Sequence, residues 1–140
     1  MSRYLLDTDT LTLVQFGHAA AVHNLAAHAD SEVALAAVTL QEQMRGWLAH
    51  LNKLSDPAQI ADWYDRLAGR MFPIWRRFEL LPFPESAQVR FDYLRSLRLN
   101  VGSMDLRLAA VALESQLIVV TRNRRDFGRV PGLQIEDWSV

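Results

Sequence analysis

Three acidic residues stand far apart in the sequence at positions where their carboxylates could act together. Asp7 follows an apolar, strand-like segment, Glu42 lies near the start of a predicted helix, and Asp105 lies in the first turn of another. Ligands of open α/β sheets bind at the carboxyl ends of the strands, so we expect these side chains to meet there. Three carboxylates that close together cannot all stay ionised without a cation. Their hard oxygens suit Mg²⁺ or Mn²⁺, which can activate water and orient a phosphodiester.

A polar turn follows the strand-like residues 117–121 at the same expected edge of the sheet. Its arginines, Arg122, Arg124 and Arg125, could hold the phosphates that flank a scissile bond. The guanidinium is a planar fork that matches phosphate well, and phosphate contacts fix the register of a bound nucleic acid. An arginine-rich turn is equally typical of a solvated surface loop, and the sequence leaves both interpretations open.

The stretch from 101 to 127 predicts a helix followed by a buried strand. Ser103 is a candidate N-cap, which places Asp105 in the first helical turn. Apolar residues then recur at helical spacing, so one face of this helix should pack on a sheet. The run Leu117-Ile-Val-Val is short and mostly β-branched, which is typical of a strand buried on both faces.

Strand-like segments alternate with helical patterns along the whole chain. The segments are residues 3–6, 32–38, 78–83, 117–121 and 133–138. This alternation predicts the α/β class, with a central parallel sheet between two layers of helices. The last segment is short and should form an edge strand. No repeat, low-complexity tract or linker interrupts the pattern, so we expect residues 1–140 to form a single domain.

Some of the polar residues also have ordinary structural explanations. Thr39 is a candidate N-cap with Glu42 three residues later, which is the capping-box arrangement. Asp9 is more typical of a helix N-cap than of a ligand. Gly46 would permit close contact between helices. Three of the four histidines fall five residues apart and do not share a helical face, so we assign all four structural or surface roles.

An apolar stripe runs through the middle of the chain. Trp63, Leu67, Met71 and Trp75 recur at helical spacing, which favours a place in the core. A second interpretation is that Trp47, Trp63, Met71 and Trp75 line a groove for a partner helix, because aromatic and methionine-rich surfaces accept amphipathic helices. The two interpretations differ in whether the stripe is buried within the monomer.

The composition excludes several classes of protein. Half of the 140 residues are hydrophobic, which argues against disorder, and the absence of cysteine excludes disulfides, thiolate metal sites and cysteine nucleophiles. The formal charge of −1 lacks the positive excess of most nucleic-acid binders. No basic-then-apolar leader opens the chain, and no apolar run approaches the roughly 20 residues of a membrane span. We therefore expect a cytoplasmic protein with no membrane partner.

Four blocks of sequence, in order and at this length, together resemble a PIN domain. More narrowly, the chain resembles the VapC toxins of bacterial toxin–antitoxin pairs. The blocks are Y-L-L-D-T-D-T (4–10), T-L-Q-E-Q-M-R-G (39–46), V-G-S-M-D-L-R-L-A-A (101–110) and V-V-T-R-N-R-R-D-F (119–127). The resemblance spans essentially the whole chain and includes the terminal G-L-Q-I-E-D-W (132–138).

This resemblance implies a Mg²⁺- or Mn²⁺-dependent endoribonuclease that acts on structured RNA such as tRNA or ribosomal RNA. By motif match, Asp7 and Asp105 bind the metal most directly, and Glu42 completes the acidic set as a ligand or by orienting water. Thr8 and Thr121 could hydrogen-bond these carboxylates. The resemblance also implies a homodimer, and a cognate antitoxin whose C-terminal segment wraps the helices and plugs the active site.

One position departs from the pattern of the family. Many PIN domains place a fourth acid two residues after the threonine that ends the fourth strand, where this chain has Asn123. Asp126, three residues on, either substitutes for that acid or caps the turn. The number of metal ions is therefore left open.

Three other functions fit parts of the sequence. D-T-D-T-L (7–11) resembles the aspartyl-nucleophile loop of haloacid-dehalogenase-type phosphatases, but that family expects threonine at Leu11 and a later catalytic lysine, and the only lysine is Lys53. A PIN nuclease that is not a toxin would carry the same acidic residues. A PIN-like binding module, which works with a DNA-binding partner and cuts little, fits the near-neutral charge and Asn123.

Overall fold

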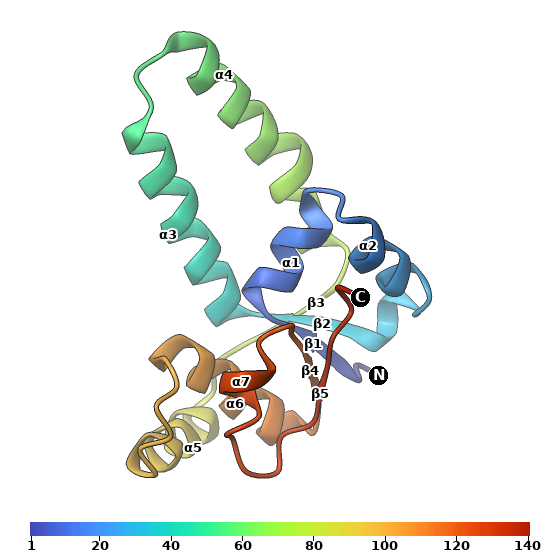
Figure 1. Cartoon of the computed structure of the whole chain (residues 1–140), viewed down its shortest axis with the longest axis vertical. Coiled ribbons are helices and arrows are strands. Elements are labelled where there is room, and N and C mark those ends of the chain that lie inside the picture. Colours follow the sequence, from blue (N-terminus) through green and yellow to red (C-terminus); the bar gives the residue numbers. More distant parts are fainter.

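Five parallel strands form the centre of the molecule, in the order β3-β2-β1-β4-β5. The computed structural model describes residues 1–140 (Figure 1). The strands are β1 (Tyr4–Leu6), β2 (Val33–Ala36), β3 (Glu79–Leu81), β4 (Ile118–Val120) and β5 (Ile135–Glu136). The predicted α/β class with a parallel sheet is confirmed, and β5 lies at the edge where it was expected.

Seven α-helices connect and cover these strands. They are α1 (Thr8–Gln15), α2 (Ala19–Ala26), α3 (Ala37–Lys53), α4 (Pro57–Arg66), α5 (Glu85–Ser96), α6 (Ser103–Ser115) and α7 (Arg124–Phe127). Shorter turns are η1 (Asp30–Glu32), the π-helical η2 (Leu67–Met71) and η3 (Pro73–Arg76). None of these helices combines the length and apolar character that a bilayer crossing requires.

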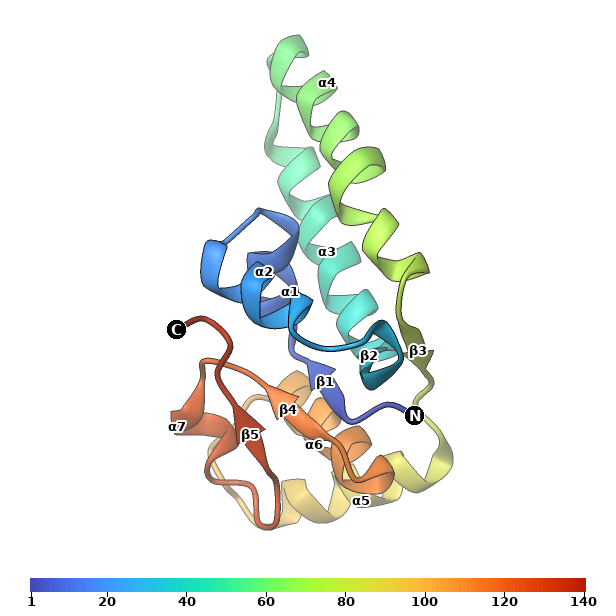
Figure 2. The ribbon, with the colours of Figure 1, turned by 90° about the vertical axis from the view of Figure 1, so that its right-hand side faces the viewer.

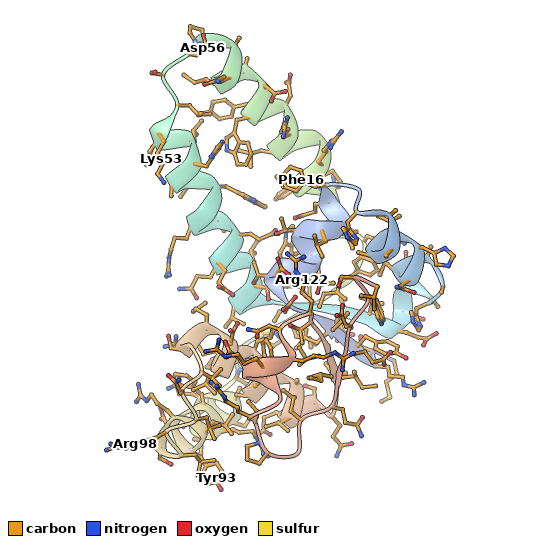
Figure 3. The ribbon with its side chains drawn as sticks, in the orientation of Figure 1. Phe16, Lys53, Asp56, Tyr93, Arg98 and Arg122 are labelled. Carbon is orange, nitrogen blue, oxygen red and sulfur yellow. The ribbon has the colours of Figure 1, made fainter.

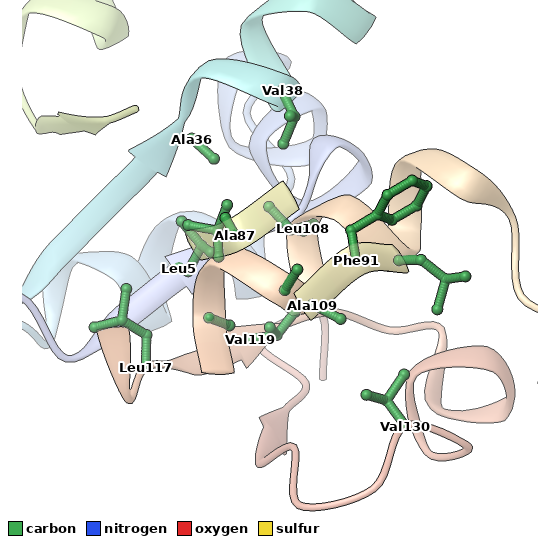
Figure 4. Packing of buried hydrophobic residues seen from close by; sticks show 14 of the residues in the cluster. Leu5, Ala36, Val38, Ala87, Phe91, Leu108, Ala109, Leu117, Val119 and Val130 are labelled. Carbon is green, nitrogen blue, oxygen red and sulfur yellow. The ribbon is translucent and has the colours of Figure 1, made fainter. Parts of the chain in front are cut away.

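Alternate residues of the strands feed two hydrophobic clusters, one on each face of the sheet. Leu5 and Val119 point to the face covered by α5 and α6, where they join Phe91 and Ala109 (Figure 4). Leu6 and its neighbours point to the opposite face, toward α1 and α2. This alternation follows from the two-residue period of a strand and explains the two helical layers seen in Figure 1.

Helices α3 and α4 form an antiparallel hairpin that extends away from the sheet (Figures 1 and 2). Helix α4 has no buried residue, and the turn between Lys53 and Asp56 lies at the far end (Figure 3). A buried amide pair anchors the base: Gln43 Nε2 donates to Gln15 Oε1 at 2.6 Å, and Trp75 Nε1 donates to Gln43 Oε1 at 3.1 Å. The hairpin is therefore held by polar contacts at its base.

The start of α3 differs from the sequence prediction. The helix begins at Ala37, directly after β2, and Ala36 is its N-cap residue without a side-chain cap. Thr39 consequently lies inside the first turn, fully buried, with a hydroxyl that has no hydrogen-bond partner. The predicted Thr39–Glu42 capping box is wrong, because the strand passes into the helix without the loop that such a cap requires.

Candidate active site

Asp7 lies where β1 passes into α1. Its backbone N–H donates to the carbonyl of Val120 on β4 at 3.0 Å, and its carboxylate accepts from the N–H of Thr10 at 2.7 Å. Asp7 is thus the N-cap of α1, and the prediction that Asp9 caps this helix is wrong. Burial raises the pKa of Asp7 above its usual value, against the opposing effect of hydrogen bonds from Thr121 and Thr10.

Glu42 reaches the same region from α3. The helix begins directly at the end of β2, so Glu42 is carried past the carboxyl edge of the sheet within its first two turns. The Thr8 hydroxyl donates to Glu42 Oε1 at 2.8 Å. This bond joins α3 to the first residue of α1 and orients the Glu42 carboxylate beside Asp7.

Asp105 lies in the first turn of α6, as predicted, although Gly102 rather than Ser103 is the N-cap residue. The pKa of Asp105 is raised to about 6, first by burial and then by the negative charges of Glu42, Asp7 and Asp126. Burial is the larger cause, and the charges of Glu42, Asp7 and Asp126 add to it because these side chains lie nearby.

These side chains line a single pocket of about 430 Å³ that contains no hydrophobic residue. Its lining residues are Asp7, Thr8, Asp9, Glu42, Asp105, Arg122 and Asn123. No three acidic or histidine side chains stand in a group ready to hold one ion. The chemistry of the donor set still fits a hard divalent cation, because a positive charge would offset the negative charges that help to raise the pKa of Asp105.

The predicted polar turn after β4 contains a short helix, α7. Asn123 lines the pocket and caps α7: its Oδ1 accepts from the Asp126 N–H at 3.2 Å, and its Nδ2 donates to the Asp126 carboxylate at 3.0 Å. Asp126 itself does not line the pocket, and its carboxylate lies 3.5 Å from Arg129. Asp126 therefore acts on the pocket through its charge, while Asn123 borders the pocket directly.

Only one of the three predicted phosphate-binding arginines lines the pocket. Arg122 does so while its guanidinium binds Asp9 through two hydrogen bonds. Arg125 is 79% exposed and lies 3.8 Å from Asp126. Sequence reasoning missed Asp9 as a pocket residue. The available signal was its place two residues after Asp7, in the first turn of the helix that Asp7 caps.

A second hollow lies on the α3–α4 hairpin and has about 340 Å³ of volume. We call it the apolar groove, and its seven lining residues, all hydrophobic, are Leu40, Met44, Trp47, Leu48, Leu51, Leu67 and Phe72. The predicted apolar stripe is therefore divided between the core and the groove. Met71 and Trp75 are buried in the core, Trp47 and Leu67 line the groove, and Trp63 Nε1 donates to the Trp47 carbonyl at 3.3 Å.

No protein-family model matches the chain. Two relatives, each named tRNA(fMet)-specific endonuclease VapC, match it over nearly their whole length. The Salmonella typhimurium protein is 26% identical over 142 residues, with 99% of each chain covered, and the Shigella flexneri protein is 28% identical over 144 residues, with 99% of this chain and 100% of its own covered. The structure of DNA-bound VapBC from Salmonella typhimurium superposes with a TM-score of 0.75 and 27% identity, covering 99% of both chains.

Proposed function

Because the chain belongs to the VapC-type PIN-domain family, we propose that it is an endoribonuclease that acts as the toxin of a toxin–antitoxin pair. One observation carries this proposal beyond family membership. Asp7, Glu42 and Asp105, from three separate segments, line one hydrophilic pocket at the carboxyl ends of β1 and β4. Such a pocket suits hydrolysis of a phosphodiester, and it offers no hydrophobic side chain to an apolar substrate.

We assign each acidic residue of the pocket a role in binding the metal ion or the attacking water. Asp7 and Asp105 would hold Mg²⁺ or Mn²⁺, and Glu42 would be a further ligand or orient the attacking water. A bound ion of this kind supplies an activated water and a positive charge for the transition state. Asp7 is fixed by the N–H of Thr10, and the hydroxyl of Thr8 fixes Glu42, so both carboxylates are oriented before any substrate arrives.

The proposed substrate is a structured RNA of the cytoplasm, with tRNA first among the candidates. Both relatives carry tRNA(fMet) in their names, and they match this chain from end to end. Arg122 supplies the single cationic side chain of the pocket lining and would bind a phosphate of the RNA. Arg124 and Arg125, which are exposed outside the pocket, would contact phosphates further along the strand.

The proposed partner is a VapB-type antitoxin, because the DNA-bound relative is a VapBC complex. Its C-terminal segment would lie along the apolar groove and reach the acidic pocket. The groove is suited to an amphipathic segment, since Met44, Leu48 and Phe72 are about half exposed and lie on one hollow surface. We also propose that the toxin is a homodimer and that residues 1–140 act as one domain.

Cleavage of total bacterial RNA by the antitoxin-free protein tests the proposal. The protein is incubated with Mg²⁺, Mn²⁺ or EDTA, beside Asp105→Asn and the control Asp92→Asn, whose side chain is exposed on α5. We expect discrete fragments that require metal, persist with Asp92→Asn and vanish with Asp105→Asn. Cleavage that survives Asp105→Asn would contradict the assigned site. A folded, metal-loaded protein that cuts nothing would favour the binding module that acts with a DNA-binding partner.

A further inference from the structure

Arg122 and Asp9 form a two-point ion pair at the rim of the acidic pocket. Arg122 Nη2 donates to Asp9 Oδ1 at 3.1 Å, and Arg122 Nε donates to Asp9 Oδ2. Arg122 follows β4, Asp9 belongs to the first turn of α1, and Figure 3 shows Arg122 beside α1. The pair therefore joins the two segments whose strands lie side by side and end at the pocket.

An exposed ion pair of this kind contributes little to stability. The side chains of Arg122 and Asp9 are 50% and 47% exposed, and pairs in such settings are worth about 1 kcal/mol at most. The molecule contains a close match in Arg77 and Asp30, which are joined by two hydrogen bonds of 3.0 and 2.9 Å and are 46% and 51% exposed. That second pair precedes β2 and β3, at the amino ends of the strands, far from the pocket.

The surroundings distinguish the two pairs. Asp7, Glu42 and Asp105 share the pocket with Asp9, so Arg122 is the one cationic group among four carboxylates. Asp9 fills the Nε and Nη2 edge of the guanidinium, which is one of the two edges with which arginine binds a phosphate at two points. A phosphate that binds Arg122 through this edge must therefore displace Asp9.

We propose that Asp9 occupies the Nε and Nη2 edge of Arg122 in the RNA-free protein and is displaced when an RNA phosphate binds at this edge. The exchange breaks two N–H···O bonds to the carboxylate and forms two to the phosphate. The released Asp9 carboxylate is half exposed and is solvated at once. Asp9 thus keeps Arg122 oriented at the rim and at the same time weakens the binding of RNA.

This inference rests on the proposed ribonuclease function. The exchange also fixes the direction in which a substitution of Asp9 should change the affinity for RNA. Removing the competing carboxylate with Asp9→Asn should tighten RNA binding about fivefold at low salt, which corresponds to the upper value for an exposed pair. It should also steepen the salt dependence of binding. When RNA binds Arg122 in the wild-type protein, it releases about one cation, but the freed Asp9 carboxylate attracts a cation in return. In Asp9→Asn no carboxylate is freed, so the net number of cations released on binding is larger by about one.

The test measures the affinity for fluorescein-labelled tRNA(fMet) by anisotropy in Ca²⁺ buffer at several salt concentrations. The variants are Asp9→Asn, Arg122→Gln, the double variant and Asp30→Asn, which frees Arg77 and changes the net charge by the same amount. We expect Asp9→Asn to bind about fivefold more tightly, Asp30→Asn to match the wild type, and the gain from Asp9→Asn to shrink in the Arg122→Gln background. Thermal unfolding of each variant shows that it is folded.

The outcomes separate this inference from the proposed function. An equal gain from Asp9→Asn with and without Arg122 would overturn the exchange, because Asp9 would then act only through its charge. Equal gains from Asp9→Asn and Asp30→Asn, or weaker binding by Asp9→Asn, would overturn it as well. The anisotropy needs no cleavage, so the expected pattern in a protein that cuts no RNA would support the exchange and count against the ribonuclease.

Discussion

The acidic pocket and the apolar groove are hollows of comparable size and opposite chemistry. The pocket has about 430 Å³ and no hydrophobic lining residue, whereas the groove has about 340 Å³ and hydrophobic lining residues only. Helix α3 borders both, with Glu42 in the pocket and Met44 in the groove. Glu42 and Met44 are two residues apart on α3, so one helix contributes side chains to both the acidic pocket and the apolar groove.

The two hollows differ most in how their side chains are supported. Asp7 is 6% exposed, lies beside a sheet strand and caps a helix, so its carboxylate is held in place. Leu48, on the α3–α4 hairpin, and Phe72, just after η2, are 58% and 55% exposed, and α4 has no buried residue. An oriented site needs buried, hydrogen-bonded support, whereas an exposed apolar hollow is suited to the antitoxin segment proposed above.

The largest expected effect is the loss of cleavage when the pocket loses a carboxylate. Asp7→Asn should lower kcat on the order of 10²-fold or more, and it should stay folded because Asn caps a helix as well as Asp does. Single-turnover cleavage of total tRNA measures the effect, and circular dichroism checks the fold. The matched variant Asp92→Asn on α5 should cleave at the wild-type rate. Equal rates for the two variants would remove Asp7 from the site.

The next effect is on binding of the antitoxin at the groove. Leu48→Glu should weaken this binding about 30-fold, the loss expected for one central interface residue, and should leave the melting temperature nearly unchanged because Leu48 is 58% exposed. Isothermal titration with the antitoxin C-terminal peptide measures the affinity. Val89→Glu, at an apolar position of α5 that is 64% exposed, is the control. Similar losses in both variants would show that the groove is not the specific surface.

A smaller effect concerns stability and pH in the metal-free protein. Burial and the charges of Glu42, Asp7 and Asp126 raise the pKa of Asp105 to about 6, and burial also raises the pKa of Asp7. Between the ordinary carboxyl pKa of about 3.9 and the raised value, the folded protein binds more protons than the unfolded chain. Its free energy of unfolding therefore falls as pH rises through this window, and the loss is complete above it.

Thermal unfolding in EDTA from pH 4.5 to 7 measures this loss. Asp105→Asn should flatten the pH profile and raise the melting temperature at pH 7, since it removes one of the repelling charges. Mg²⁺ should have a similar effect on the wild type. A wild-type profile that already matches that of Asp105→Asn would show that the carboxylates of the pocket do not repel one another.

The smallest effect is expected at Gly46, which lies on α3 about one turn after Glu42. The sequence suggested a close helix contact there, but a Cβ atom would meet no atom within 4 Å. Gly46→Ala should therefore stabilise the helix by roughly 0.5–1 kcal/mol, and it should alter neither cleavage nor antitoxin binding. Chemical denaturation measures the change. A loss of antitoxin affinity would show that the partner needs the open space at Gly46.

The parts of the fold that the sequence predicted are those in which a local pattern has one solution. The β-branched run Leu117-Ile-Val-Val predicted a buried strand, and β4 (Ile118–Val120) forms there. The order of strands and helices then implied the parallel sheet. The shared edge of that sheet is what led us to expect Asp7, Glu42 and Asp105 in one pocket.

The misses occur where the outcome depends on a distant segment. Thr39 resembled an N-cap, but β2 passes straight into α3 because pairing on the sheet extends only to Ala36. Asp9 also resembled a cap, but Arg122, 113 residues later, binds it. The division of the apolar stripe between core and groove could not be predicted either, because it depends on how far the α3–α4 hairpin extends from the sheet. No local period of the sequence carries that information.

The buried amide pair at the base of the hairpin holds α3 at a point between the two hollows. Gln43, which bonds to Gln15 and Trp75, stands between Glu42 of the pocket and Met44 of the groove in the chain. At 1.5 Å per residue, the 17 residues of α3 span about 25 Å. If a partner bound in the groove shifts Glu42, then, by thermodynamic reciprocity, a cation bound by Glu42 changes the affinity for that partner by the same factor.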